Sequence, residues 1–151
     1  MTRGEIMAME PGRILDRMVQ KHIFKWIPWM EKRVDYLVVT YQKPGEKEPY
    51  MRSQNWRTEK DRYSIIEFSE IDPMKHAVYG DKDFSTEIAL AWEVEAIFEQ
   101  DTKLRGDYAI ELNNVLGLKL YELTTLDNIY KLAHATPEQR CKAALLVFMN
   151  L

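Results

Sequence analysis

The chain has 151 residues, of which 46% are apolar and 30% are charged. This composition is that of an ordinary globular protein and excludes an intrinsically disordered chain. The net charge at pH 7 is −3, with 13 basic and 9 acidic side chains in residues 1–62 and 8 basic and 15 acidic ones in residues 63–151. Because the basic residues of the first part alternate with acidic ones, we expect a mixed solvated surface and consider nucleic-acid binding disfavoured.

The length fits a single domain, which we predict over residues 1–151. A chain this long can bury a core without disulfides or metals, and the one cysteine, Cys141, has no partner for an internal disulfide. The sequence contains neither a recognisable secretion signal nor an apolar stretch of membrane length. We therefore expect a cytoplasmic protein that does not associate with a membrane.

The first predicted element is a helix over residues 11–24. Pro11 suits the opening turn, where its missing N–H is not needed. Pro28 cannot donate to a helical ladder, so the helix should end before "KWIPWM", and residues 27–30 are interpreted as a linker. The residues that recur at helical spacing on one face are Ile14, Leu15, Met18, Val19 and His22.

Two strands are predicted next, at residues 34–42 and 62–68, because both segments are rich in β-branched and aromatic residues. The sequence "KPGEKEP" at residues 43–49 has the chemistry of a turn. It predicts a hairpin that joins residues 34–42 to a partner strand at residues 50–56.

The segment "DKDFSTEIALAWEVEAIFEQ" at residues 81–100 predicts a second helix. Ser85 is expected to cap it, and Ala91, Val94 and Phe98 form an apolar stripe. Ile88 and Trp92 flank this stripe, and Trp92 is expected to be largely buried against the sheet. A ligand or metal site at this helix start is disfavoured, because clustered carboxylates repel an anion and the segment lacks the glycine and the distal acid of a calcium loop.

The C-terminal third is predicted to hold a second hairpin followed by a helix. Apolar residues alternate in "DYAIELNN" and "LKLYELTT", which flank residues 115–117, and "NIYKLAHA" could extend the sheet. Thr136 as N-cap, Pro137 in the first turn and Gln139 in a capping box then start the last helix. Its apolar face consists of Cys141, Ala144, Leu145 and Phe148.

These elements predict an α+β fold, with a mainly antiparallel sheet of about five strands covered by three helices. Three segments also resemble a known family: "MEPGRILD" at residues 9–16, "FSTEIALAWEV" at residues 84–94 and "CKAALL" at residues 141–146. In this order they are similar to the phage ABA sandwich domain family, small proteins of phages and prophages. The resemblance implies an α-β-α layered sandwich and carries no assigned catalytic or binding residues.

The chain departs from the family pattern in two places. Its central part, residues 34–82, is longer than the family leads us to expect. Glu95 stands where an apolar residue is more usual, and its side chain would project towards the predicted core.

The sequence indicates no catalytic residue, no metal site and no cofactor-binding motif. The sequence has no phosphate-binding glycine loop, no Cys-x-x-Cys, no His-x-x-x-His and no Gly-x-Ser-x-Gly. His22, His76 and His134 are expected to be structural or exposed, and Cys141 to be an inert core thiol. Aromatic residues at helix and strand positions are expected in the core rather than as stacking platforms: Trp26, Trp29, Trp56 and Trp92.

Three functions stay open. The favoured one is a non-enzymatic accessory protein of a phage or prophage that binds a host or phage protein. An alternative is a module that sequesters a small ligand such as a nucleotide messenger used in host defence, with Arg52, Trp56 and Arg57 as the side chains to test. The last is a hydrolase that uses carboxylates such as Asp72, Asp81 and Asp83, although no base or nucleophile is visibly paired with them.

Self-association is also expected. Side chains on both faces of the strand at residues 34–42 are apolar and need cover. The large apolar groups of residues 27–30 would lie outside the core if this segment is a linker, and such patches are commonly covered in a homodimer. We predict a homo-oligomer with Trp29 and Met30 near the contact.

Overall fold

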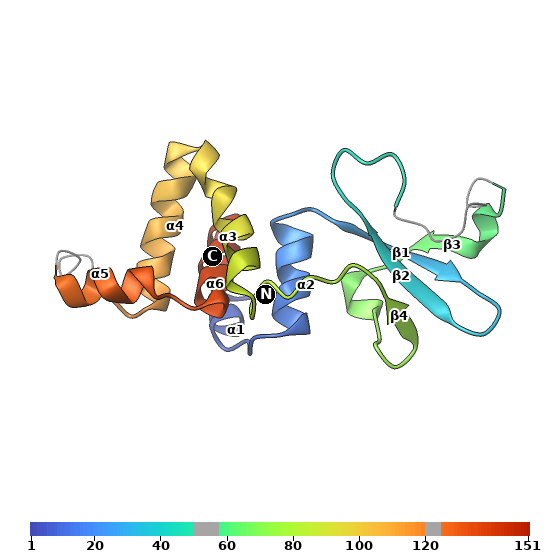
Figure 1. The fold of residues 1–151 in the computed structure, drawn as a ribbon, viewed down its shortest axis with the longest axis horizontal. Coiled ribbons are helices and arrows are strands. Elements are labelled where there is room, and N and C mark those ends of the chain that lie inside the picture. Colours follow the sequence, from blue (N-terminus) through green and yellow to red (C-terminus); the bar gives the residue numbers. More distant parts are fainter. Residues whose placement is uncertain (50–57, 120–124) are drawn as a thin grey trace. The chain divides into compact units, whose positions relative to one another are not determined.

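The fold was analysed in a computed structural model of the chain, which describes residues 1–49, 58–119 and 125–151. The chain forms two compact units. The helical unit consists of residues 1–23 and 82–151, and the sheet unit of residues 24–81. The predicted α+β class is confirmed (Figure 1).

The helical unit is arranged around its last helix. Its helices are α1 (Arg3–Met7), α2 (Arg13–His22), α3 (Ile88–Ala96), α4 (Thr102–Val115), α5 (Leu126–Ala133) and α6 (Pro137–Phe148). Helices α1, α2, α3 and α4 all pack against α6. All seven residues from Arg140 to Leu146 are buried, which is the pattern of a central helix surrounded by neighbours.

The start of α6 agrees with the sequence prediction. The Thr136 hydroxyl accepts a hydrogen bond from the backbone N–H of Gln139, and the Gln139 side chain accepts one from the N–H of Thr136. Pro137 lies in the first turn, where it costs no hydrogen bond. Cys141, Ala144 and Leu145 are buried as predicted, whereas Phe148 is half-buried and contacts Phe98 edge-on.

The sheet unit contains one mixed sheet of four described strands. They are β1 (Ile27–Lys32), β2 (Leu37–Gln42), β3 (Tyr63–Ile65) and β4 (His76–Val78), in the order β3-β1-β2-β4. Strand β1 is antiparallel to β2 and β3, and β4 runs parallel to β2. Val38 and Val39, which point to opposite faces of β2, are both buried, as expected for a central strand.

Residues 27–30 were wrongly predicted as a linker, since they form the first four of the six residues of β1. Pro28 lies opposite Tyr41 and contributes its carbonyl, which accepts a hydrogen bond from Ile66 N–H at 3.2 Å. The strand therefore continues through a residue that cannot donate. The hairpin partner of β2 is thus β1, joined to it by a turn in which Arg33 N–H donates to Tyr36 C=O at 2.9 Å.

The predicted turn at residues 43–49 forms at its start, where Glu46 N–H donates to Lys43 C=O at 3.1 Å. Gly45 has a φ of 85°, a left-handed conformation that favours glycine. The strand predicted to follow, residues 50–56, lies outside the described residues.

The second hairpin was also wrong, because its predicted first strand, residues 107–114, lies in α4. Residues 120–124 of its predicted second strand lie outside the described residues. The segment at residues 128–135, which could have extended the sheet, lies mostly in α5. Asp101 caps α4 by accepting from the N–H groups of Lys103 and Leu104. A strand would place Tyr108, Ile110 and Leu112 on one face, but Tyr108 and Leu112 are buried whereas Ile110 is 44% exposed. The described residues thus contain six α-helices and four strands, where the sequence predicted about three and five. The prediction of a single domain over residues 1–151 stays a prediction, because it concerns cooperative unfolding.

Candidate functional site

The three segments that carry the family resemblance meet in the interior of the helical unit. Gly12 N–H donates to the Ser85 hydroxyl at 2.7 Å, and Ser85 N–H donates to the Asp16 carboxylate at 2.7 Å. The Cys141 thiol donates to the Phe84 carbonyl at 3.3 Å. These contacts tie the N-terminal segment, the start of α3 and α6 together, so their role is to hold the core.

Ser85 is therefore not the helix cap that the sequence predicted. Helix α3 begins after Glu87, whose side chain makes no capping hydrogen bond with the described residues. Ser85 lies in the turn before it and is 2% exposed. The Ser85 hydroxyl had suggested a helix cap. In the structure the hydroxyl accepts from Gly12 and the Ser85 N–H donates to Asp16, and both partners are distant in the chain.

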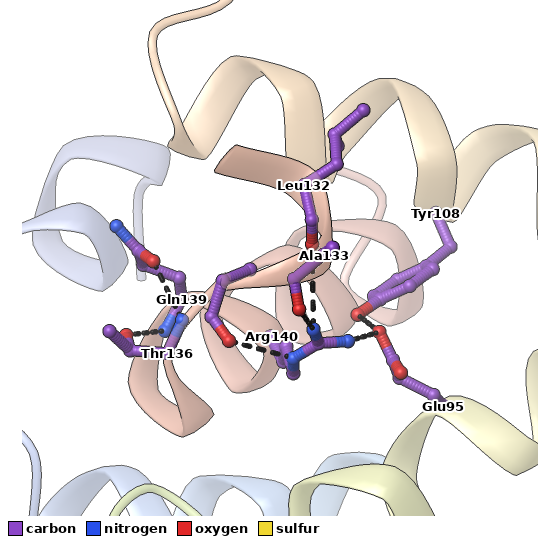
Figure 2. A network of polar contacts seen from close by, with 8 residues as sticks. Glu95, Tyr108, Leu132, Ala133, Thr136, Gln139 and Arg140 are labelled. Carbon is purple, nitrogen blue, oxygen red and sulfur yellow. Dashed lines mark hydrogen bonds and ion pairs between the residues drawn. The ribbon is translucent and has the colours of Figure 1, made fainter. Parts of the chain in front are cut away.

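A second polar network is centred on Arg140, which is 7% exposed (Figure 2). The Glu95 carboxylate accepts from the Arg140 guanidinium at 2.6 Å and from the Tyr108 hydroxyl. Burial, followed by the hydrogen bond to Glu95, raises the pKa of the Tyr108 hydroxyl, which therefore remains a donor at neutral pH. Glu95 is accommodated as a half-buried acid because two donors on α4 and α6 satisfy it.

The same guanidinium also fixes the end of α5. Arg140 Nε donates to the Ala135 carbonyl at 2.9 Å, and Nη2 contacts the carbonyls of Ala133 at 3.2 Å and Leu132 at 3.5 Å (Figure 2). The last carbonyls of a helix have no partner within the helix, and a cation beside them complements the helix dipole. At the other end of α5, the Thr125 hydroxyl accepts from Asn128 N–H. Helix α5 is thus capped at its start and held by Arg140 of α6 at its end.

Helix α5 exposes the apolar side that an amphipathic helix normally buries. Leu126 is 86% exposed, Ile129 52% and Tyr130 61%, and Ala133 is exposed as well. Their spacing of i, i+3, i+4 and i+7 places them on one side of the helix. The buried residue is instead the polar Asn128. We call Leu126, Ile129, Tyr130 and Ala133 the α5 face, and it is the candidate functional site.

The α5 face was missed because residues 128–135 were interpreted as an extension of the sheet. A sequence signal was present, since Thr125 is a good N-cap residue and four apolar or small residues follow at helical spacing. The short length of the segment allowed either interpretation.

The prediction that Trp92 is largely buried is wrong, because its side chain is 57% exposed. Helix α3 packs against α6, and its buried residues are Ala91 and Val94. Trp92 lies one position beyond Ala91 on the helix, and Ile88, one turn before it, is 41% exposed. The predicted stripe of Ala91, Val94 and Phe98 is confirmed as core.

The other candidate residues do not gather into one site among the described residues. Arg52, Trp56 and Arg57 lie outside the described part of the chain. Trp29 and Met30 are half-buried within β1, where Trp29 Nε1 donates to the Gln42 side chain at 3.0 Å. Their predicted place at a subunit contact stays a prediction.

The candidate carboxylates make local structural contacts. Asp72 accepts from Met74 N–H at 2.9 Å, a hydrogen bond that lowers the pKa of its carboxyl, and it pairs with Lys75 at 3.4 Å. Asp81 accepts from the Tyr41 hydroxyl within the sheet unit. The Asp83 carbonyl accepts from Glu87 N–H in the turn before α3. The carboxylates of Asp72 and Asp81 thus have structural partners, whereas the contact of Asp83 is made by its backbone.

Cys141 is fully buried, and burial raises the pKa of its thiol, which disfavours the nucleophilic thiolate. The His76 ring contacts the backbone of Asp72 through Nδ1. In the described part of the chain, no group of three or more His, Cys, Asp or Glu side chains is placed to hold a metal ion. No helix formed by the described residues combines the length and the apolar character needed to cross a membrane.

Comparisons of the chain with models of known protein families, with curated proteins and with solved structures gave no match. The feature that points to a function is therefore the α5 face, together with the contacts of Thr125 and Arg140 that order α5.

Proposed function

We propose that this protein acts by binding another protein chain through the α5 face and does not catalyse a reaction. The observation that carries this proposal is the exposed apolar face of a helix that is capped by Thr125 at its start and held by Arg140 at its end. A protein partner can recognise such a helix through anchors at i, i+3, i+4 and i+7 in an apolar groove or against another helix. Because Arg140 and Thr125 already order the helix, little conformational entropy is lost when the partner binds.

The biological setting is proposed from the sequence motifs. Residues 9–16, 84–94 and 141–146 resemble the phage ABA sandwich domain family, which supports an accessory protein of a phage or prophage that works in the bacterial cytoplasm. The α-β-α layering implied by that family belongs to the same proposal. The partner is then a protein of the host or of the phage, and the proposal includes a homo-oligomeric state.

Site-specific photo-crosslinking in the bacterial host tests the proposal. A photoreactive phenylalanine replaces Tyr130 in the α5 face or, as a matched control, Tyr36, which is 48% exposed in the sheet unit. We expect one specific cross-linked protein with the probe at position 130 and none with the probe at position 36. The captured protein is identified by mass spectrometry and purified for binding measurements.

Binding to the purified partner is then compared between wild type, Ile129→Glu and the control Ile110→Glu. Ile110 is also a helical isoleucine and is 44% exposed, but it lies on α4. A charge in the α5 face should weaken binding by at least about tenfold, whereas Ile110→Glu should leave it unchanged. Equal binding by all three proteins would refute a role of the α5 face.

A further inference from the structure

We infer that a second exposed helix side, on α3, binds a basic segment of another protein in which Lys or Arg residues flank an apolar side chain. This inference goes beyond the proposed function, because it concerns a different helix and a partner of defined charge. The apolar residues that α3 exposes are Ile88, Ala89, Trp92 and Ala96, and we call them the α3 face. Their spacing of i, i+1, i+4 and i+8 places them within about 100° of the helix circumference.

Trp92 and Ile88 are the large side chains of the α3 face. They are 57% and 41% exposed, and residues four apart on a helix are neighbours, so the two form one continuous apolar surface. Tryptophan is among the residues that most often dominate the binding energy of a protein interface. The face of its indole ring also attracts a Lys or Arg side chain. Trp92 is therefore suited to anchor a segment that is both apolar and basic.

The segment that carries the α3 face is strongly acidic. Residues 82–101 hold six acidic side chains and one basic side chain, Lys82. Two of the acids are paired with cations, Glu93 with Lys82 at 2.7 Å and Glu95 with Arg140 at 2.6 Å (Figure 2). The other four are exposed and make no ion pair with the described residues: Asp83, Glu87, Glu99 and Asp101. The surroundings of the α3 face therefore carry an excess of negative charge.

The acids border the α3 face along its sides and at its ends. Glu93 and Glu95 each lie about 80° from the centre of the face, on opposite sides, because each residue turns the helix by about 100°. Glu99 belongs to the 3-10 turn η3 (Phe98–Gln100), about two turns after Trp92, and so lies on the Trp92 side. Glu87 precedes the first residue of α3. A partner on the α3 face thus meets carboxylates around its apolar contact.

The stability of α3 does not account for this arrangement of charges. Carboxylates stabilise the start of a helix and cations its end, but α3 has no acidic residue in its first turn and no basic residue in its last. Only Glu87, at the N-cap, is favourably placed. Glu95 lies in the last turn and Glu99 just beyond it, next to the negative end of the helix dipole. A cation supplied by a partner would be attracted by both the side chains and the dipole.

The sign of this charge defines the class of partner. Nucleic acids and anionic lipid surfaces are negatively charged, so the acids around the α3 face repel them. A protein segment with Lys or Arg beside an apolar residue matches the α3 face in both respects, and such complementary charges give specificity. The α5 face has no comparable sign, since Asp127 and Lys131 pair with each other at 2.6 Å. The two faces therefore select partners by different chemistry.

Fluorescence anisotropy with two labelled synthetic peptides tests the inference on the full chain. Both peptides are about four helical turns long and have leucines at the same helical spacing, but one has lysine and the other glutamate at the remaining positions. We expect the lysine peptide to bind at least about tenfold more tightly than the glutamate peptide at about 50 mM salt, and more weakly at about 500 mM. Equal binding of the two peptides, or binding of neither, overturns the inference.

An alanine substitution locates the bound peptide. Trp92→Ala should weaken binding of the lysine peptide by about tenfold or more. Tyr130→Ala is the matched control, because it removes an exposed aromatic side chain from the α5 face, and it should leave binding unchanged. Circular dichroism verifies that both variants are folded. Wild-type binding by Trp92→Ala overturns the inference, and loss with Tyr130→Ala alone would place the peptide on the α5 face and leave the proposed function intact.

A charge reversal tests the acidic border. Glu99→Lys should weaken binding of the lysine peptide by at least about fivefold and reduce its salt dependence. Asp35→Lys makes the same change in net charge at an exposed position of the sheet unit and should alter binding by less than about twofold. Equal effects of the two variants would show that only the net charge matters and overturn the site. Sedimentation without peptide is the last check, since a dimer that Trp92→Ala dissociates would identify a second copy as the occupant and overturn the inference.

Discussion

Ser85 donates its backbone N–H to the carboxylate of Asp16 at 2.7 Å, across 69 positions of the chain. Both residues are at least 97% buried. The Ser85 hydroxyl in turn accepts from the N–H of Gly12, whose φ of 129° favours glycine. This pair connects the start of α2 to the turn before α3 and replaces the local helix cap that the sequence had suggested.

Ser85→Ala should lower the free energy of unfolding by about 1–3 kcal/mol, because the partly buried N–H of Gly12 loses its acceptor. Urea denaturation measures this loss, and Thr86→Ala, next to it but exposed, is the control. Asp16→Ala removes the acceptor of the Ser85 backbone N–H, which Ser85→Ala leaves in place, so it should cause a separate loss of about 1–3 kcal/mol. A Ser85→Ala loss no larger than that of Thr86→Ala would contradict the structural role of the Ser85 hydroxyl.

Arg140 should be among the residues least tolerant of substitution. Arg140→Met removes the partner of the half-buried Glu95 and leaves carbonyls at the end of α5 without a donor, so we expect a loss of about 3–5 kcal/mol. Tyr108→Phe removes only one donor to Glu95 and should cost about 1–2 kcal/mol. Equal losses for the two variants, measured by thermal and urea unfolding, would contradict the central place of Arg140.

Trp92→Ala should cost less than about 1 kcal/mol, because its side chain is more than half exposed in the folded chain. Phe98→Ala is the comparison, since Phe98 is 1% exposed and contacts both Tyr108 and Phe148. We expect about 3–5 kcal/mol for that change. A Trp92 variant as unstable as the Phe98 variant would show that the indole is buried in solution.

Glu111 should contribute to the pH dependence of stability. The hydrogen bond from Arg3 lowers the pKa of its carboxyl in the folded chain below the unfolded value. The unfolded state therefore binds the proton more readily, and the stabilisation is complete above the unfolded pKa of about 4.3 and is lost as the pH falls through the folded pKa. The stability difference between wild type and Glu111→Gln should shrink from pH 6 to pH 3. A difference that is constant over this range would contradict the pairing.

The predicted single domain requires that the helical and sheet units unfold together. Phe98→Ala in the helical unit and Val39→Ala in the sheet unit should then shift the same transition, observed by both circular dichroism and tryptophan fluorescence. Two separate transitions, each moved by only one of the variants, would show that the units are independent domains.

Some elements could be predicted from the local sequence, because the interactions that form them join residues only a few positions apart. The Thr136–Gln139 capping box and Pro137 define the start of α6, and the turn after Lys43 follows from its proline and glycine. The core residues Ala91, Val94 and Phe98 followed from helical periodicity, and the α+β class from the mixture of patterns. These features depend on neighbours in sequence, so the sequence by itself determined them.

Other features were decided only by the tertiary structure. Residues 27–30 are a strand because β2 and β3 pair with them on both sides, and Trp92 is exposed because α6 packs on the side of α3 that carries Ala91 and Val94. The alternation of apolar and polar residues in α4 suggested a strand, but in the folded chain Tyr108 and Leu112 are buried whereas Ile110 is exposed. The α5 face is the clearest case: periodicity can identify an apolar side of a helix, but only packing determines whether that side is buried or exposed. In α5 the bonds from Arg140 and the burial of Asn128 direct the apolar side outwards.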